Sequence, residues 1–128
     1  MRFFLGSYPQ WERRALLPIW ERATLLALAQ MRVIARRTLQ SYWKKHADAE
    51  GPLKAWFAEA SKATWRGMMD IRKRYATASI IDAETVVFNL GGNKYRLVVR
   101  LFFRGRCVWI KFIGTHQKYD EIEDITKL

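Results

Sequence analysis

The chain of 128 residues has one cysteine, Cys107, and two histidines, His46 and His116. A single thiol excludes an internal disulfide framework and a cysteine-based zinc site, and two imidazoles exclude a histidine-rich metal cage. A lone cysteine is typical of a reducing compartment, so we expect a cytoplasmic protein. No run of ~18 uncharged apolar residues is present, which predicts no membrane span. We therefore expect no metal, no cofactor and no membrane partner.

Acidic residues are also scarce, with 12 Asp and Glu against 23 Lys and Arg and a net charge of +11. Four of the acids fall together between Asp120 and Asp124, where we expect a solvated acidic cap. The basic excess predicts an anionic partner, which is a nucleic acid, an acidic membrane or an acidic protein. The length suits one domain with one modest core.

Residues 1–30 differ from the rest because they are dense in apolar residues without a clean helical stripe. Pro18 suits the first turn of a helix that runs to about Gln30, and Met31 opens a stretch that resembles the start of a domain. The sequence predicts an N-terminal extension outside the native fold (1–30) and a single domain (31–128). The alternative is a real helix that packs on the domain or on a partner.

Residues 31–75 show helical periodicity after a short candidate strand at 31–35. Apolar residues follow the i, i+3, i+4, i+7 spacing from Leu39 to His46 and again from Leu53 to Ala60. This predicts two amphipathic helices, at about 36–46 and 52–63, and a turn or broken helix at 64–75. The run Arg72, Lys73 and Arg74 is a candidate phosphate contact, although basic runs are often only solvated.

Residues 78–115 change to a period of two, which predicts three antiparallel strands at 85–90, 94–103 and 106–114. Gly91-Gly92 and Arg104-Gly105 mark the two hairpin turns. The expected pairs across the sheet are Phe88 with Tyr95, Asn89 with Lys94, Leu101 with Val108, Val99 with Ile110, Leu97 with Phe112, Arg100 with Trp109 and Val98 with Lys111. The sequence thus predicts an α+β fold in which two N-terminal amphipathic helices pack on a small antiparallel sheet, followed by a short C-terminal helix.

The apolar face of this sheet is expected to receive the helices. The opposite face is basic and carries an aromatic residue that can stack on a base. The alternative is that long basic side chains simply cover a partly exposed sheet. The candidate RNA-binding residues on this face are Asn89, Lys94, Arg96, Arg100, Trp109 and Lys111.

Three residues of different chemistry are expected to meet at one rim of the basic face. His116 and Tyr119 share a helix face if the C-terminal helix begins near Thr115, and Arg96 lies close by on the neighbouring strand. Metal-independent RNA cleavage needs a proton acceptor, a cation for the developing phosphorane charge and a proton donor. Imidazole, guanidinium and phenol supply these groups. Alternatively, His116 only caps a strand end.

Two stretches resemble the HigB toxins of type II toxin–antitoxin modules. They are Val87-Phe88-Asn89-Leu90-Gly91-Gly92-Asn93-Lys94-Tyr95-Arg96-Leu97-Val98 and Gly114-Thr115-His116-Gln117-Lys118-Tyr119-Asp120. The segments Met31-Arg32-Val33-Ile34 and Ala78-Ser79-Ile80 look similar too, so the resemblance covers about residues 31–123.

The resemblance implies a RelE-like fold and an endoribonuclease that acts on mRNA at the ribosome. It also implies a HigA-type antitoxin partner with a helix-turn-helix domain. Arg96 matches the phosphate-binding arginine of the superfamily, and His116 and Tyr119 fall where related toxins carry catalytic His or Tyr. Two other hypotheses stay open, namely a non-catalytic basic RNA-binding module and a protein-interaction module whose basic surface binds an acidic partner.

Overall fold

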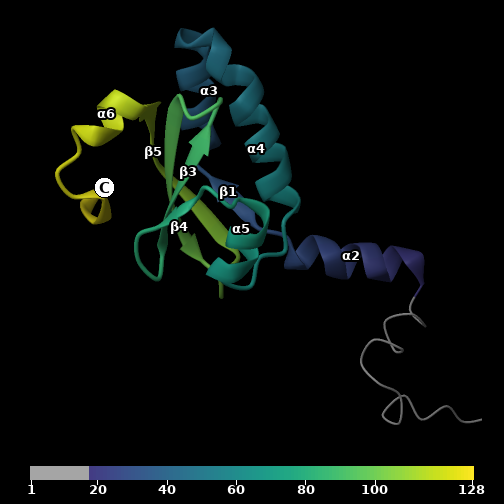
Figure 1. Cartoon of the computed structure of the whole chain (residues 1–128). Helices are drawn as coiled ribbons and strands as arrows, with labels where there is room; N and C mark the ends of the chain where they lie inside the picture. Colours follow the sequence, from purple (N-terminus) through teal and green to yellow (C-terminus); the bar gives the residue numbers. More distant parts are fainter. Residues whose placement is uncertain (1–17) are drawn as a thin grey trace, which may run out of the picture.

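The computed structural model describes residues 18–128, which are built around a five-stranded sheet with the order β1-β5-β4-β3-β2 (Figure 1). The strands are β1 (Arg32–Ile34), β2 (Ser79–Ile80), β3 (Thr85–Leu90), β4 (Tyr95–Phe102) and β5 (Cys107–Thr115). The helices are α2 (Ile19–Ala29), α3 (Arg36–Lys45), α4 (Glu50–Lys62), α5 (Met68–Arg74) and α6 (His116–Asp120). Two 3₁₀ turns, η2 (Ala47–Ala49) and η3 (Ile125–Lys127), complete the described chain.

The predicted fold class is wrong in its sheet and in its C-terminal part. The sheet is mixed rather than antiparallel, because β1 pairs with β5 in parallel, with Arg32 opposite Cys107 and Ile34 opposite Trp109. β1 has only three residues, so its sequence pattern could not show whether it pairs parallel or antiparallel. At the C-terminal end, the single expected helix is replaced by the five-residue α6 and the separate turn η3.

The hairpin registers were predicted in part. Leu101 pairs with Val108 and Val99 with Ile110, as expected. A β-bulge between Val98 and Val99 then leaves Lys111 without an opposite residue and shifts the rest of β5 by one, since Leu97 pairs with Ile113. The expected pairs of Leu97 with Phe112 and Val98 with Lys111 are therefore wrong.

The loop between β3 and β4 is longer than the expected two-residue turn. Gly91, Gly92 and Asn93 all have positive φ, so the first pair of the hairpin is Leu90 with Tyr95 and not Leu90 with Asn93. The expected pairs of Phe88 with Tyr95 and Asn89 with Lys94 are wrong by two residues, which keeps every side chain on its expected face. Lys94 is left in the loop rather than on the strand.

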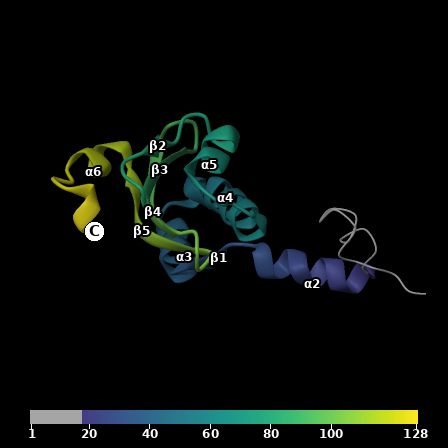
Figure 2. The ribbon, with the colours of Figure 1, turned by 90° about the horizontal axis from the view of Figure 1, so that it is seen from below.

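The apolar face of the sheet packs against α3, α4 and α5, which all contribute residues to one core. In Figure 2, α4 and α5 lie next to each other on one side of the sheet. Both predicted amphipathic helices are present within two residues of their expected bounds, and their stripes bury Leu39, Leu53 and Trp56. Phe88 of β3 is at the centre of this core. Its ring lies 5.5 Å from the ring of Trp56 and 4.9 Å from that of Tyr75, both in edge-to-face contact.

The opposite face of the sheet is partly covered by the C-terminal segment. In Figure 2, α6 and the end of the chain lie across the sheet from α4 and α5. The guanidinium of Arg100 donates a 2.7 Å hydrogen bond to the carbonyl of Thr126. Val87 and Val98, which point to this face, are 2% and 0% exposed. The face predicted to bind RNA is thus less open than the strand pattern suggested.

Helix α2 projects from the body of the molecule and joins it next to β1 (Figure 1). Whether residues 1–30 lie outside the native fold remains a prediction, and residues 1–17 fall outside the described residues. Across residues 18–128, no helix combines the length and the apolar character needed to cross a membrane.

We predict that Phe88→Ala lowers the free energy of unfolding by about 3–5 kcal/mol, because it removes a 1% exposed ring from three aromatic neighbours. Phe102→Ala is the matched control, since this ring is 55% exposed on the next strand, and it should cost under about 1 kcal/mol. Urea unfolding of both variants tests this. Equal losses would contradict the placement of the core.

Candidate active site

The candidate site lies where β4 begins, β5 ends and α6 starts. Arg96 on β4 is directly opposite Gly114 on β5. A Cβ on Gly114 would come within 2.6 Å of the Phe112 ring, so a side chain at this position would require that ring to shift. The half-buried Arg96 side chain donates through Nη1 to the carbonyls of Asn93, at 2.9 Å, and Tyr95, at 3.3 Å. These bonds hold the guanidinium at the strand end.

His116 is fixed in place by the backbone at the start of α6. Its N–H donates a 3.0 Å hydrogen bond to the carbonyl of Lys94, which ties α6 to the start of β4. The Thr115 hydroxyl accepts from the Lys118 N–H at 3.3 Å and so caps the short helix. The five-residue α6 therefore begins at His116, with Thr115 as its N-cap.

The imidazole of His116 has a carboxylate partner one helical turn away. Nδ1 of His116 lies 3.0 Å from Oδ2 of Asp120. With its hydrogen on Nδ1, the ring donates to this carboxylate, and Nε2 is left as a hydrogen-bond acceptor. Both side chains are more than half exposed, so the pair is accessible from solvent. Asp120 was expected to be only part of an acidic cap, although its i, i+4 spacing from His116 was the signal that could have identified it.

Tyr119 is the third group of the site. Burial raises the pKa of its phenol, the charge of Arg96 lowers it, and the charge of Asp120 raises it. Tyr119 is thus within electrostatic reach of both residues, and its raised pKa keeps it protonated near neutral pH. The structure places Arg96, His116 and Tyr119 at the same end of the sheet, with Tyr119 within electrostatic reach of Arg96. Their catalytic roles stay a prediction.

The structure places Lys94 outside the basic sheet face. Its ammonium forms an ion pair with Asp48 of η2, on the helix-covered side of the sheet. The Tyr95 hydroxyl donates to the same carboxylate at 2.6 Å. Hydrogen bonds from Lys94 and then Tyr95 lower the pKa of Asp48 to about 2. The contacts of Lys94 and Tyr95 with Asp48 anchor the loop whose Lys94 carbonyl accepts from the His116 N–H. Lys94 therefore contributes to the candidate site by positioning His116.

The other predicted RNA-binding residues lie at different distances from the site. Asn89 is paired with Arg96 across the sheet, and its amide donates to the carbonyl of Thr77 at 3.0 Å. Trp109 is 44% exposed and lines a shallow hollow of about 290 Å³ with Lys111 and Arg100. Arg100 and Trp109 are near the other end of the strands from His116, whereas Lys111 is at the middle of β5.

The basic run of α5 is on the helix-covered side of the sheet, away from Arg96 (Figure 2). Arg74 forms an ion pair with Glu59, and its guanidinium lies 5.0 Å from the centre of the Tyr75 ring. Arg72 and Lys73 are exposed. The structure therefore does not bring Arg72, Lys73 and Arg74 to the candidate active site, and a role for them in RNA binding stays a prediction. In residues 18–128, no three His, Cys, Asp or Glu side chains are clustered as metal ligands would be.

A comparison of the sequence with known protein families identifies the family to which the chain belongs. A family described as the RelE-like toxic component of a toxin–antitoxin system matches residues 49–122, which is more than half of the chain. The chain therefore belongs to the HigB toxin family. The match ends just beyond Asp120 and includes all the residues of the candidate active site.

Three curated relatives share a shorter stretch. They are the mRNA interferase toxin HigB of Escherichia coli strain K12 and the mRNA interferases HigB of Escherichia coli O157:H7 and Shigella flexneri. Each is 44% identical over 34 residues, which is 27% of this chain and 33% of the relative. The match thus spans about a third of the length of these relatives.

We predict that Asp48→Asn lowers Tm at pH 7, because the ion pair with Lys94 and the hydrogen bond from Tyr95 are weakened. The pKa of Asp48 is depressed, so its contribution is complete above the ordinary value of 3.8 and is lost as pH falls through about 2. The Tm difference from wild type should therefore shrink between about pH 4 and pH 2. Glu123→Gln is the control, since no ion pair of Glu123 is seen in the described chain. A pH-independent Tm difference would contradict the assignment.

Proposed function

We propose that the chain is a toxin that cleaves mRNA at the ribosome without a metal and is neutralised in the cytoplasm by a HigA-type helix-turn-helix antitoxin. In this proposal residues 31–128 form the toxin domain and residues 1–30 are an extension to it. The family match supports the toxin class, and the names of the curated relatives support an mRNA substrate. The observation that carries the proposal is the convergence of Arg96, His116 and Tyr119.

The geometry suits attack by the ribose 2′-hydroxyl on its own phosphate. Nε2 of His116 accepts the 2′-hydroxyl proton, because Nδ1 is engaged by Asp120. The new O2′–P bond forms as the P–O5′ bond breaks, and the products carry a 2′,3′-cyclic phosphate and a 5′-hydroxyl. Arg96 stabilises the negative charge that develops on the phosphoryl oxygens.

Tyr119 is assigned as the proton donor to the leaving 5′-oxygen. Its raised pKa means that the phenol holds its proton near neutral pH, which suits a donor and not a base. After cleavage, the His116 imidazolium releases its proton to solvent and the Tyr119 phenolate takes a proton from solvent, so both residues return to their starting states. Asn89, beside Arg96, and the more distant Arg100, Trp109 and Lys111 then bind the RNA on either side of the scissile phosphate, and Lys94 holds the His116 loop.

Expression of the full chain should arrest growth and create new mRNA 5′ ends, which primer extension detects. Arg96→Ala and His116→Gln should each lower cleavage by about 10²-fold or more, because each removes a group that acts in the transition state. Lys45→Ala on α3 is the control for lost positive charge. Arrest without new ends in the folded protein would favour the alternative, a non-catalytic RNA-binding module.

Cleavage of free RNA by a high concentration of the purified chain should be the same in EDTA as in its absence, because this assay contains no ribosome that needs Mg²⁺. Products with 2′,3′-cyclic phosphate ends would match the assigned step. Comparison of free mRNA with ribosome-bound mRNA tests the ribosome requirement directly. Loss of cleavage in EDTA, or 5′-phosphate products, would contradict the metal-independent mechanism.

Asp120 is assigned as a positioning residue that acts through His116. We predict that Asp120→Ala lowers the single-turnover cleavage rate by about tenfold and that Asp120→Asn, whose amide oxygen still accepts from Nδ1, retains more activity. In a His116→Gln background, Asp120→Ala should have no further effect, because the group that it orients is gone. Additive losses would show that Asp120 acts independently of His116.

A further inference from the structure

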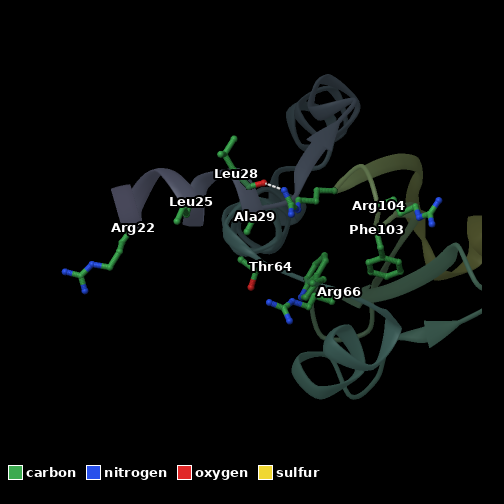
Figure 3. A pocket seen from close by; sticks show the side chains of 10 residues that line it. Arg22, Leu25, Leu28, Ala29, Thr64, Arg66, Phe103 and Arg104 are labelled. Atoms are coloured by element: carbon green, nitrogen blue, oxygen red, sulfur yellow. Dashed lines mark hydrogen bonds between the residues drawn. The ribbon is translucent and has the colours of Figure 1, made fainter. Parts of the chain in front are cut away.

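A groove of about 920 Å³ lies at the end of the sheet opposite to His116. It is formed by α2, by the segment that follows α4 and by the turn between β4 and β5 (Figure 3). β5 separates it from the candidate active site by nine residues, or about 30 Å at about 3.3 Å per residue. The volume is in the range of ligand-binding clefts, which is about 300–1,000 Å³.

Four arginines from three separate segments line the groove. Arg22 comes from α2, Arg66 follows α4, and Arg104 and Arg106 belong to the β4–β5 turn. All four are exposed. None of the lining residues that the structure describes is acidic, and none of the four guanidiniums has an ion pair within residues 18–128. Like charges distributed along one groove favour an extended anionic occupant.

The groove also has an apolar lining that an anion alone would not use. Leu25 and Leu28 of α2 are 49% and 64% exposed, and Phe103 lies across from them in the β4–β5 turn (Figure 3). The apolar surface continues along α2, where Ile19 and Trp20 are 77% and 69% exposed. An occupant that covers this surface must be partly apolar itself.

Arg106 holds the two walls of the groove together. Its guanidinium donates to the carbonyl of Leu28, which belongs to the last turn of α2, and its own carbonyl accepts a 2.7 Å hydrogen bond from the Arg32 N–H. Arg106 has a positive φ of 54°, a backbone conformation that is unfavourable for residues other than glycine. A glycine would relieve this conformation but would lose the bond to α2. The groove is thereby formed before any partner arrives.

We propose that this groove docks an acidic amphipathic segment of a partner protein, with carboxylates on the arginines and apolar side chains against Leu25, Leu28 and Phe103. RNA fits less well, because Leu25 and Leu28 offer no stacking surface and Trp65 is only 8% exposed, which leaves Phe103 alone among the described lining residues to stack on a base. A second copy of this chain also fits less well, because it brings a further +11 charges to the same arginines. The site is separate from the proposed RNA-cleavage site.

The test uses the full chain and fluorescence anisotropy with a labelled peptide of about 16 residues, with Leu at helical i, i+3, i+4, i+7 spacing and Glu elsewhere. A peptide with Gln in place of Glu and a short oligouridylate are the comparison probes. The double variant Arg66→Glu with Arg104→Glu should lower the affinity for the Glu peptide at least about tenfold. Lys44→Glu with Lys45→Glu, which makes the same charge change on α3, should weaken it less than about twofold. Arg22→Glu and Leu25→Ser, both on the exposed helix, should each weaken it several-fold.

His116→Gln should bind the Glu peptide like wild type, so that failure of the cleavage proposal and failure of this one are distinguishable. If the arginine and the lysine double variants lower the affinity for the Glu peptide equally, the effect is due to net charge alone and the proposal is overturned. Equal affinity for the Glu and Gln peptides would also overturn it. Oligouridylate binding that depends on Arg66 and Arg104 would assign the groove to RNA. A dimer in light scattering that Leu25→Ser dissociates would assign α2 to self-association.

Discussion

The antiparallel pairing of β4 with β5 is the constraint on which the rest of the structure depends. Its register sets Arg96 against Gly114 at one end and closes the arginine-lined turn at the other. The bulge at Lys111 is essential to this arrangement, because it shifts the last residues of β5 by one and so changes the face that each occupies. Gly114 thereby shares a face with Arg96, and α6 starts where His116 reaches the same rim.

Periodicity was enough to predict the elements that bury a continuous apolar stripe. The helices around Leu39 and Trp56 and the strands around Phe88 and Leu97 all follow from such patterns, since a one-residue error would expose the whole stripe. The bulge could not be predicted because an inserted residue is visible only against its partner strand. β1 was too short to reveal its direction, and the covering of Val98 by the C-terminal segment depends on contacts between distant residues.

The candidate site was predictable where single residue types carry the chemistry, and less so where partners decide the role. Arg96, His116 and Tyr119 are together because strand order and a helix of known spacing bring them there. Lys94 looked equivalent to its neighbours in sequence, but Asp48, 46 positions earlier, engages it on the other side of the sheet. Charge counting gives the number of cations, whereas ion pairs decide which of them remain available to a ligand.

The parallel pairing of β1 with β5 has a consequence for biosynthesis. Arg32 pairs with Cys107, so β1 waits for a strand that is translated 75 residues later. Contacts of such long sequence separation form slowly, because the chain between them must first be ordered. The nascent chain can form its two helices early, but neither end of β5 can be completed until that strand has been made. A polypeptide whose proposed action is against translation thus acquires its RNA-cleavage geometry only after most of its own translation is finished.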